Sequence, residues 1–274
     1  MNSRLSCVAR LAGLLKPHQC GSLAGLSASD VTTTLTHEIR TLPMAGNKVS
    51  TLFLDIKGGF DNVNPSSLCS MLKVKAVNAD LVSWTRSFLT GRTCRLRYQG
   101  SPNAFAPVSV GTPQGSPISP LLFVIYVSRL HCEIPQGLTV SYVDHFGLTV
   151  SSTSYRCNIQ SLQRHCAVRK ARGAQPGVSF SIPKTELVHW RTIKDRGPVS
   201  HSPVHLEGLL FPSKDEVGWL GYWFTPSVST TLHFTKRLAK AQAAFMAIKR
   251  LSSEDGSSPV LVPPVGLLSP LPHP

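Results

Sequence analysis

The sequence is poor in acidic residues and contains no long apolar run. Only 14 of its 274 residues are Asp or Glu, against 28 Lys and Arg, which gives a formal net charge of +14. Uncompensated positive charge is typical of proteins that bind phosphate-rich partners, although composition alone fits an ordinary basic protein equally well. No apolar stretch approaches the ~20 residues that a membrane span requires, so we predict a protein without membrane contact.

Disulfide and zinc-binding spacings are also missing. The seven cysteines are odd in number and include no Cys-x-x-Cys pair, which favours reduced thiols in an intracellular protein. Cys157, His165 and Cys166 fall on one predicted basic helix, where isolated Cys and His are usually structural. Residues 1–16 contain Ser and Arg but no acid. That pattern is typical of a mitochondrial transit peptide and equally of an ordinary first helix, and we favour the helix.

Predicted strands and helices are mixed without strict alternation, which indicates an α+β fold rather than a doubly wound sheet. An apolar, β-rich run at 49–56 ends in Asp55, and two apolar runs flank Asp144, as in a hairpin. The other predicted strands are 93–100 and 104–110, with a strand or hairpin at 219–224. The predicted helices are 30–42, 65–76, 79–89, 119–130, 154–172 and 233–251.

Two acidic residues at strand ends suggest a chemical function. Asp55 and Asp144 are expected on adjacent antiparallel strands, and Asp61 follows the first of them. Carboxylates so placed can hold a pair of Mg²⁺ ions for an in-line phosphoryl displacement. The Gly/Pro-rich turn at 111–120 lets backbone approach a nucleotide closely. A single Asp at a strand end is more often a turn or cap residue, so the hypothesis depends on the combination.

Several motifs occur together in a characteristic order. Taken together they resemble the palm motifs of reverse transcriptases from non-LTR (LINE-type) retrotransposons. The resemblance covers about residues 8–251 and is carried by "LLKPHQCGSLAGLSASDVTTTLTHEIR", "FLDIKGGFDNV", "GTPQGSPISPLLF", "YVDH", "SFSIPKTELVHW" and "WLGYWF".

The resemblance implies a fold, an activity and partners. The fold would be a polymerase palm, an antiparallel sheet backed by helices, with partial fingers and the start of a thumb. The activity would be RNA-directed DNA polymerisation in the nucleus, with an RNA template, a DNA primer, dNTPs and Mg²⁺, or Mn²⁺ as the alternative. The corresponding segments are 1–48 (N-terminal fingers and palm-entry helical segment), 49–226 (palm), 227–252 (helical thumb start) and 253–274 (disordered Pro-rich tail).

The resemblance also implies roles for single residues. Asp55 and Asp144 would bind the metal ions, and Lys184 would protonate the leaving pyrophosphate. The residues next to the nucleotide or template would be Phe60, Gln114, Gly115 and Tyr142. Phe60 would reject ribonucleotides by a clash with the 2′-hydroxyl. Without the resemblance, Phe60 is better interpreted as a core aromatic and Lys184 as a solvated charge. The aromatic-rich segment 219–224 would form the primer grip, or its aromatic side chains would belong to the core.

One position departs from the family pattern. The hairpin normally reads Tyr-x-Asp-Asp, whereas here His145 replaces the second acid. Neutral imidazole suits zinc, copper or iron better than magnesium, so we interpret His145 as damage, with a shift towards Mn²⁺ as the minor alternative. A carboxylate about 6 Å from a divalent ion contributes on the order of 5 kcal/mol, reduced by screening to ~3 kcal/mol.

Three hypotheses therefore remain open. The chain is an impaired reverse transcriptase domain, a catalytically dead palm that binds nucleic acid, or a product without function. For binding, the predicted basic helix offers Arg164, Arg169, Lys170 and Arg172, although such residues often form only a solvated face. The short fingers, the short thumb and the absence of room for an endonuclease domain lead us to expect a truncated, degenerate copy.

Overall fold

The computed structural model describes residues 2–98, 101–174, 177–191 and 202–254. The chain divides into two compact units, Met1–Ser229 and Thr230–Pro274. The second unit contains helix α7 (Thr231–Glu254), which includes the predicted helix 233–251. From residue 255 onwards, the predicted Pro-rich tail lies outside the described residues.

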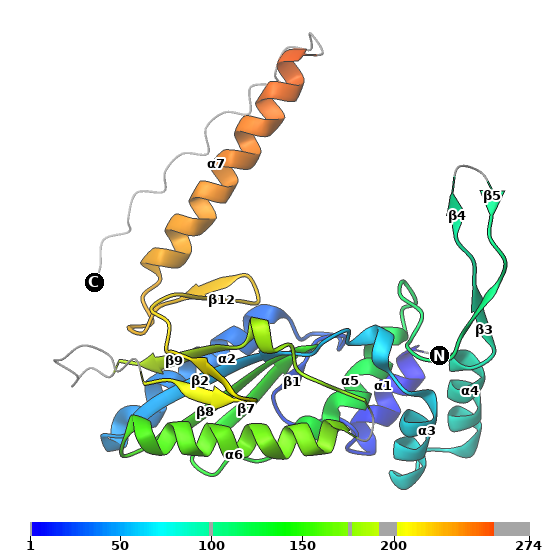
Figure 1. Ribbon diagram of the computed structural model, residues 1–274, viewed down its shortest axis with the longest axis horizontal. Helices are drawn as coiled ribbons and strands as arrows, with labels where there is room; N and C mark the ends of the chain where they lie inside the picture. Colours follow the sequence, from blue (N-terminus) through cyan, green and yellow to red (C-terminus); the bar gives the residue numbers. More distant parts are fainter. Residues whose placement is uncertain (1, 99–100, 175–176, 192–201, 255–274) are drawn as a thin grey trace. The chain divides into compact units, whose positions relative to one another are not determined.

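The first unit is built on a mixed five-stranded sheet with the order β1-β7-β8-β2-β9 (Figure 1). β1 is parallel to β7, and every other neighbouring pair is antiparallel. The strands are β1 (Gln19–Cys20), β2 (Lys48–Asp55), β7 (Gly137–Tyr142), β8 (His145–Ser152) and β9 (Glu186–Trp190). The structure thus confirms the predicted α+β class and a mainly antiparallel sheet, to which β1 adds one parallel strand.

The sheet is buried on both faces, as its interior strand β2 shows, because this strand carries apolar side chains on both faces. In β2, Leu52 and Leu54 belong to one hydrophobic cluster, whereas Val49 and Phe53 belong to another. Side chains alternate across a strand, so the two clusters lie on opposite faces of the sheet. This double burial explains why the sequence of β2 is a nearly continuous apolar run.

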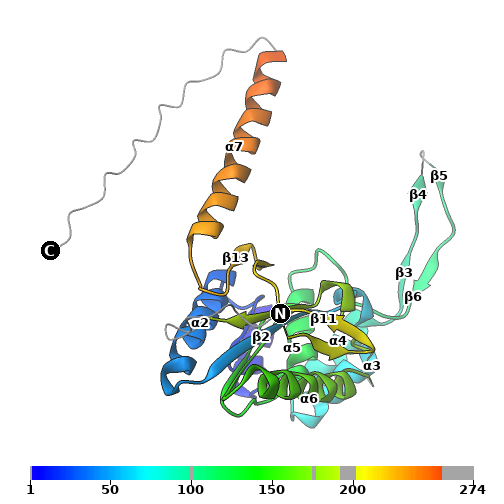
Figure 2. The ribbon, with the colours of Figure 1, turned by 60° about the vertical axis from the view of Figure 1, so that its left-hand side comes forward.

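Helices cover both faces (Figures 1 and 2). Those that contribute to the first cluster are α1 (Asn2–Leu11), α3 (Pro65–Val74), α4 (Ala79–Leu89), α5 (Ser119–Val127) and α6 (Tyr155–Ala174). The second cluster receives α2 (Ala28–Thr41) and the hairpin β12–β13 (Val217–Trp219 and Tyr222–Phe224). Ser27 caps α2 with a capping box that it forms with Asp30.

Two smaller hairpins complete the first unit. β10 (Val204–Leu206) pairs with β11 (Leu209–Phe211). In the second hairpin, β3 (Arg92–Cys94) pairs with β6 (Ala106–Val108), and β4 (Arg97–Tyr98) pairs with β5 (Ser101–Pro102). The predicted strand pair 93–100 and 104–110 is therefore interrupted rather than continuous. We call the segment from 92 to 110 the hairpin arm.

A glycine after β1 allows the β7–β8 hairpin to pack closely. Gly21 has a φ of +91°, and a Cβ at this position would lie 2.5 Å from Cγ2 of Val143. The backbone N–H of Val143 also donates to the carbonyl of Cys20 at 3.1 Å. A side chain at position 21 would therefore displace the turn that carries Asp144.

We expect Gly21→Ala to lower the free energy of unfolding by roughly 3 kcal/mol, through strain at positive φ and a steric clash. Gly25→Ala is the matched control, because Gly25 has a φ of +81° but no heavy atom within 4 Å of an added Cβ. It should cost only about 1 kcal/mol. Urea denaturation measures both values, and equal losses would contradict the packing argument.

Candidate active site

Folding brings Asp55, Asp144 and His145 together at one end of the sheet. One potential ligand atom from each residue lies within 4.8 Å of the others. Asp55 is the last residue of β2, Asp144 belongs to the two-residue turn between β7 and β8, and His145 is the first residue of β8. Residues far apart in the sequence thus form one cluster of hard oxygen and imidazole nitrogen donors.

The strand register places these side chains. His145 is the direct partner of Asp55 across β2–β8 and of Tyr142 across β7–β8. Directly opposed residues share a face, so the three side chains project on the same side of the sheet. In the turn between β7 and β8, Val143 has a φ of +55°, a conformation that is strained for a β-branched residue. The carbonyl of Asp144 accepts from the N–H of Ile56 at 3.0 Å, which ties the turn to the end of β2.

Asp55 is the buried member of the cluster, with its side chain only 7% exposed. Its Oδ2 accepts from Nζ of Lys184 at 2.6 Å. Nδ1 of His145 lies 3.1 Å from Oδ1, but not in hydrogen-bond geometry, so Oδ1 has no hydrogen-bond partner among the described residues. The hydrogen bond to Asp55 and the charge of that carboxylate raise the pKa of Lys184.

The other two members are partly open to solvent. Oδ1 of Asp144 lies 3.9 Å from Nε2 of His145, and their side chains are 35% and 40% exposed. Buried carboxylate oxygens nearly always have a hydrogen bond or a cation. The unpartnered Oδ1 of Asp55, facing an accessible carboxylate and an imidazole, therefore fits a divalent cation.

The Gly/Pro-rich turn packs on the segment after β2. The carbonyl of Phe60 accepts from the N–H of Thr112 at 2.8 Å, and Gln114 donates to Oδ1 of Asp61 at 2.9 Å. Gly111, with a φ of +82°, has no space for a Cβ, which would lie 2.9–3.1 Å from backbone atoms of Phe60 and Asp61. The sequence did not indicate that Phe60 and Asp61 would hold this turn against the segment after β2.

The predicted nucleotide residues have different surroundings. Phe60 is half-buried and packs on Phe123 with ring centroids 4.9 Å apart. Gly115 is exposed with a φ of +87°. Tyr142 is half-buried at the end of β7 and packs against the second cluster. The core interpretation of Phe60 and a position next to a ligand are therefore compatible, because the ring is only partly covered.

A pocket of about 360 Å³ opens beside Asp55. His145 and Lys184 line it together with Trp219 and Leu220 from the β12–β13 hairpin. The residues 219–224 thus form a hairpin next to the cluster, and Trp219 and Phe224 also belong to the core. Glu186 also lines the pocket, but it was not predicted from the sequence as a site residue. The only feature of the sequence that could have indicated it is its position two residues after Lys184.

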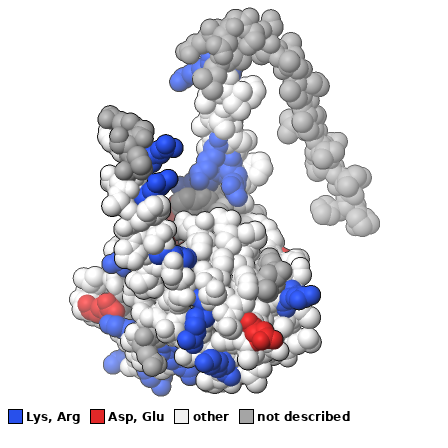
Figure 3. All heavy atoms as spheres, turned by 90° about the vertical axis from the view of Figure 1, so that its right-hand side faces the viewer, with Lys and Arg blue, Asp and Glu red and all other residues white. Residues whose placement is uncertain are grey.

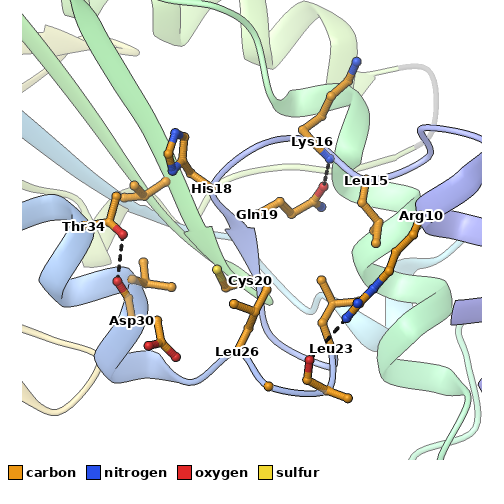
Figure 4. A pocket seen from close by; sticks show the side chains of 14 residues that line it. Arg10, Leu15, Lys16, His18, Gln19, Cys20, Leu23, Leu26, Asp30 and Thr34 are labelled. Atoms are coloured by element: carbon orange, nitrogen blue, oxygen red, sulfur yellow. Dashed lines mark hydrogen bonds between the residues drawn. The ribbon is translucent and has the colours of Figure 1, made fainter. Parts of the chain in front are cut away.

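A second pocket, of about 460 Å³, lies at the β1 edge between α1 and α2 (Figure 4). Its lining includes Arg10, Lys16 and Gln19, and Arg10 donates to the carbonyl of Ala24 at 3.2 Å. Cys20 also lines it, and burial raises the pKa of that thiol. The pocket is larger than the one beside Asp55, but none of the three clustered residues contributes to it.

The prediction that Arg169 belongs to an exposed basic face of α6 is wrong. Arg169 is fully buried in α6 and donates to the carbonyl of Cys132 and to Oγ1 of Thr139. Lys170 forms an ion pair with Glu207 at 2.6 Å. Arg169 therefore stabilises the fold instead of facing a partner. Basic side chains elsewhere remain accessible, and Figure 3 shows Lys and Arg spread over one face with few acids among them.

The described residues of the hairpin arm combine exposed basic and aromatic side chains. Arg95 and Arg97 are exposed, and the guanidinium of Arg95 lies over the ring of Phe105 at 5.0 Å. Leu96, Tyr98 and Phe105 are 65–74% exposed.

Within the described part of the chain, we find no helix with both the length and the apolar character needed to cross a bilayer.

The fold resembles solved telomerase structures. Apo telomerase from Candida tropicalis matches with a TM-score of 0.58 at 13% identity, over 82% of this chain and 40% of that one. Telomerase from Candida albicans, in complex with the TWJ fragment of telomeric RNA, matches with a TM-score of 0.56 at 14% identity, over 83% and 37%. At these identities the similarity shows the fold alone.

Comparison with protein families assigns the chain to one of them. Residues 1–224 match the family model described as "Reverse transcriptase (RNA-dependent DNA polymerase)". The chain belongs to the reverse transcriptase family.

Curated relatives come from non-LTR retrotransposons of Drosophila melanogaster, as the motifs predicted. The probable RNA-directed DNA polymerase from transposon BS is 25% identical over 226 residues, covering 80% of this chain and 25% of the relative. The RNA-directed DNA polymerase from mobile element jockey is 28% identical over 201 residues, covering 70% and 21%. The chain thus spans about a quarter or less of the length of these relatives.

Proposed function

We propose that this chain is the catalytic domain of a retroelement RNA-directed DNA polymerase, with an activity impaired by His145. The observation that supports this most directly is the convergence of Asp55 and Asp144 at the tip of the β7–β8 hairpin. Residues 49–226 form the palm in this proposal, 1–48 its entry segment and 227–252 the start of a thumb.

Each site residue has a role in this proposal. Asp55 and Asp144 hold divalent ions, Mg²⁺ or Mn²⁺, which when bound neutralise the charge that develops on the transferred phosphoryl group. Lys184, which pairs with Asp55, holds a proton for the leaving group in this proposal. The residues that contact the incoming dNTP or the template are Phe60, Gln114, Gly115 and Tyr142.

The proposed partners are an RNA template and a DNA primer, with action in the nucleus. The formal net charge of +14 supplies attraction for a phosphate backbone. The hairpin arm adds arginines and exposed rings, a combination suited to stacking and charge contacts with single strands. Binding that weakens steeply with salt would support this part of the proposal.

Primer extension on an RNA template tests the activity. We expect His145→Asp to extend the primer about a hundredfold faster than the native chain in Mg²⁺, because ~3 kcal/mol of electrostatic stabilisation is regained. His145→Asn is the control, since it removes the imidazole without adding a charge. A similar gain in the asparagine variant would contradict the electrostatic explanation.

A second candidate function is a catalytically dead palm that only binds nucleic acid. It is favoured by the contacts of Asp55, whose two oxygens face Lys184 and His145 in this structure. Failure of both the native chain and His145→Asp to extend a primer, with salt-sensitive RNA binding retained, would favour this alternative over the polymerase.

A further inference from the structure

We infer that Asp55, Asp144 and His145 form a site for one transition-metal dication, with Zn²⁺ bound more tightly than Mg²⁺ and the imidazole of His145 as a ligand. The inference rests on the proposed function in that it names the ion for the same site. Metal binding can nevertheless be measured without polymerisation. The inference also changes the interpretation of His145: the residue does not only impair the site but changes which metal ion the site prefers.

The distances suit shared coordination. Ligand atoms around a tetrahedral Zn²⁺ lie roughly 3.3 Å apart when each bond is about 2.0 Å. Nδ1 of His145 and Oδ1 of Asp55 are already 3.1 Å apart. One ligand atom of Asp144 lies within 4.8 Å of one from each of the other two residues. Its contact with His145 is through the second ring nitrogen, Nε2, at 3.9 Å, so the 35% exposed side chain of Asp144 would turn towards an ion held at Nδ1.

The buried carboxylate provides an independent argument. Asp55 has a side chain that is 7% exposed, and its Oδ1 lacks a hydrogen-bond partner among the described residues. Lys184 occupies only the other oxygen, Oδ2. An ion bound to Oδ1 would therefore satisfy the unpaired atom without displacing the lysine.

The charge of the cluster favours a single ion. Two carboxylates and the ammonium of Lys184 leave one net negative charge when the imidazole is neutral. One dication inverts this charge to a single positive one, whereas a pair of dications would leave a large uncompensated excess. An aspartate at position 145 would add one negative charge, so that one dication would leave the cluster neutral and a pair would leave two positive charges instead of three.

The donor types decide which ion is preferred. Mg²⁺ is hard, requires oxygen ligands and keeps several of its waters, whereas imidazole binds Zn²⁺ well. Carboxylate oxygen and imidazole nitrogen are both ligand types that Zn²⁺ accepts in proteins. His145 therefore shifts the preference of the cluster from Mg²⁺ towards Zn²⁺.

Titration calorimetry of the full chain with Zn²⁺ alone and with Mg²⁺ alone tests the inference. We expect one equivalent of Zn²⁺ to bind at least about 100-fold more tightly than Mg²⁺. Co²⁺ serves as a spectroscopic probe, because its visible absorption reports the geometry of its ligands. His145→Asn should weaken Zn²⁺ and Co²⁺ binding by at least about tenfold, and circular dichroism verifies that the variant is folded.

His37→Asn is the matched control, because His37 is exposed on α2, outside the cluster, and the variant should bind Zn²⁺ as the native chain does. Unchanged Zn²⁺ affinity and an unchanged Co²⁺ spectrum in His145→Asn would overturn the inference and place the ion at other His or Cys residues. Tighter binding of Mg²⁺ than of Zn²⁺ would overturn it as well. Primer extension by His145→Asp in Mg²⁺ would leave the proposed function standing in either case.

Discussion

Asp55→Asn is expected to lower the rate of primer extension by the His145→Asp chain at least about a thousandfold, to below detection. The expected loss corresponds to ~4 kcal/mol of transition-state stabilisation. Asp55 provides the only side chain of the cluster that is held almost entirely out of solvent. An amide there keeps the shape but removes the charge that holds a divalent ion and pairs with Lys184.

The control for this variant is another aspartate that lies on the surface. Asp215 is exposed in the segment between β11 and β12, and Asp215→Asn in the same His145→Asp background should extend primers at the unchanged rate. Thermal unfolding of both proteins shows whether a lost rate reflects a lost fold. Unchanged nucleotide incorporation by Asp55→Asn, in a folded protein, would refute the assignment of the metal site.

Local sequence patterns predicted the strands that carry the site. The apolar run before Asp55 predicted a buried strand that ends at the acid, and β2 does end there. The short polar interruption around Asp144 predicted a hairpin tip, and the turn between β7 and β8 is at that position. Both signals depend on residues that are neighbours in the chain, which is why the sequence contains them.

Contacts between distant segments could not be predicted in the same way. Arg169 lies in a basic helical stretch, but its burial depends on acceptors at Cys132 and Thr139, more than 25 residues earlier in the chain. The contact of Lys184 with Asp55 likewise depends on the antiparallel pairing of β2 and β9. Such features require knowledge of which segments pack together.

Trp190→Ala is expected to lower the free energy of unfolding by about 4 kcal/mol, a larger loss of stability than we expect for Gly21→Ala. Trp190 is fully buried at the end of β9, and its indole N–H donates to Oγ1 of Thr51 at 2.7 Å. Its ring also meets that of Phe224 edge to face, with centroids 6.1 Å apart. The loss therefore combines a cavity with a broken buried hydrogen bond.

Trp190→Phe separates these two contributions, because it keeps most of the ring but not the indole N–H. It should cost only about 1–2 kcal/mol, measured by urea denaturation beside the alanine variant. Because β9 pairs with β2 from Val49 to Phe53, the alanine variant should also weaken the strand that positions Asp55. Equal stability of the two variants would show that the hydrogen bond to Thr51, and not the packing of the ring, holds β9 against β2.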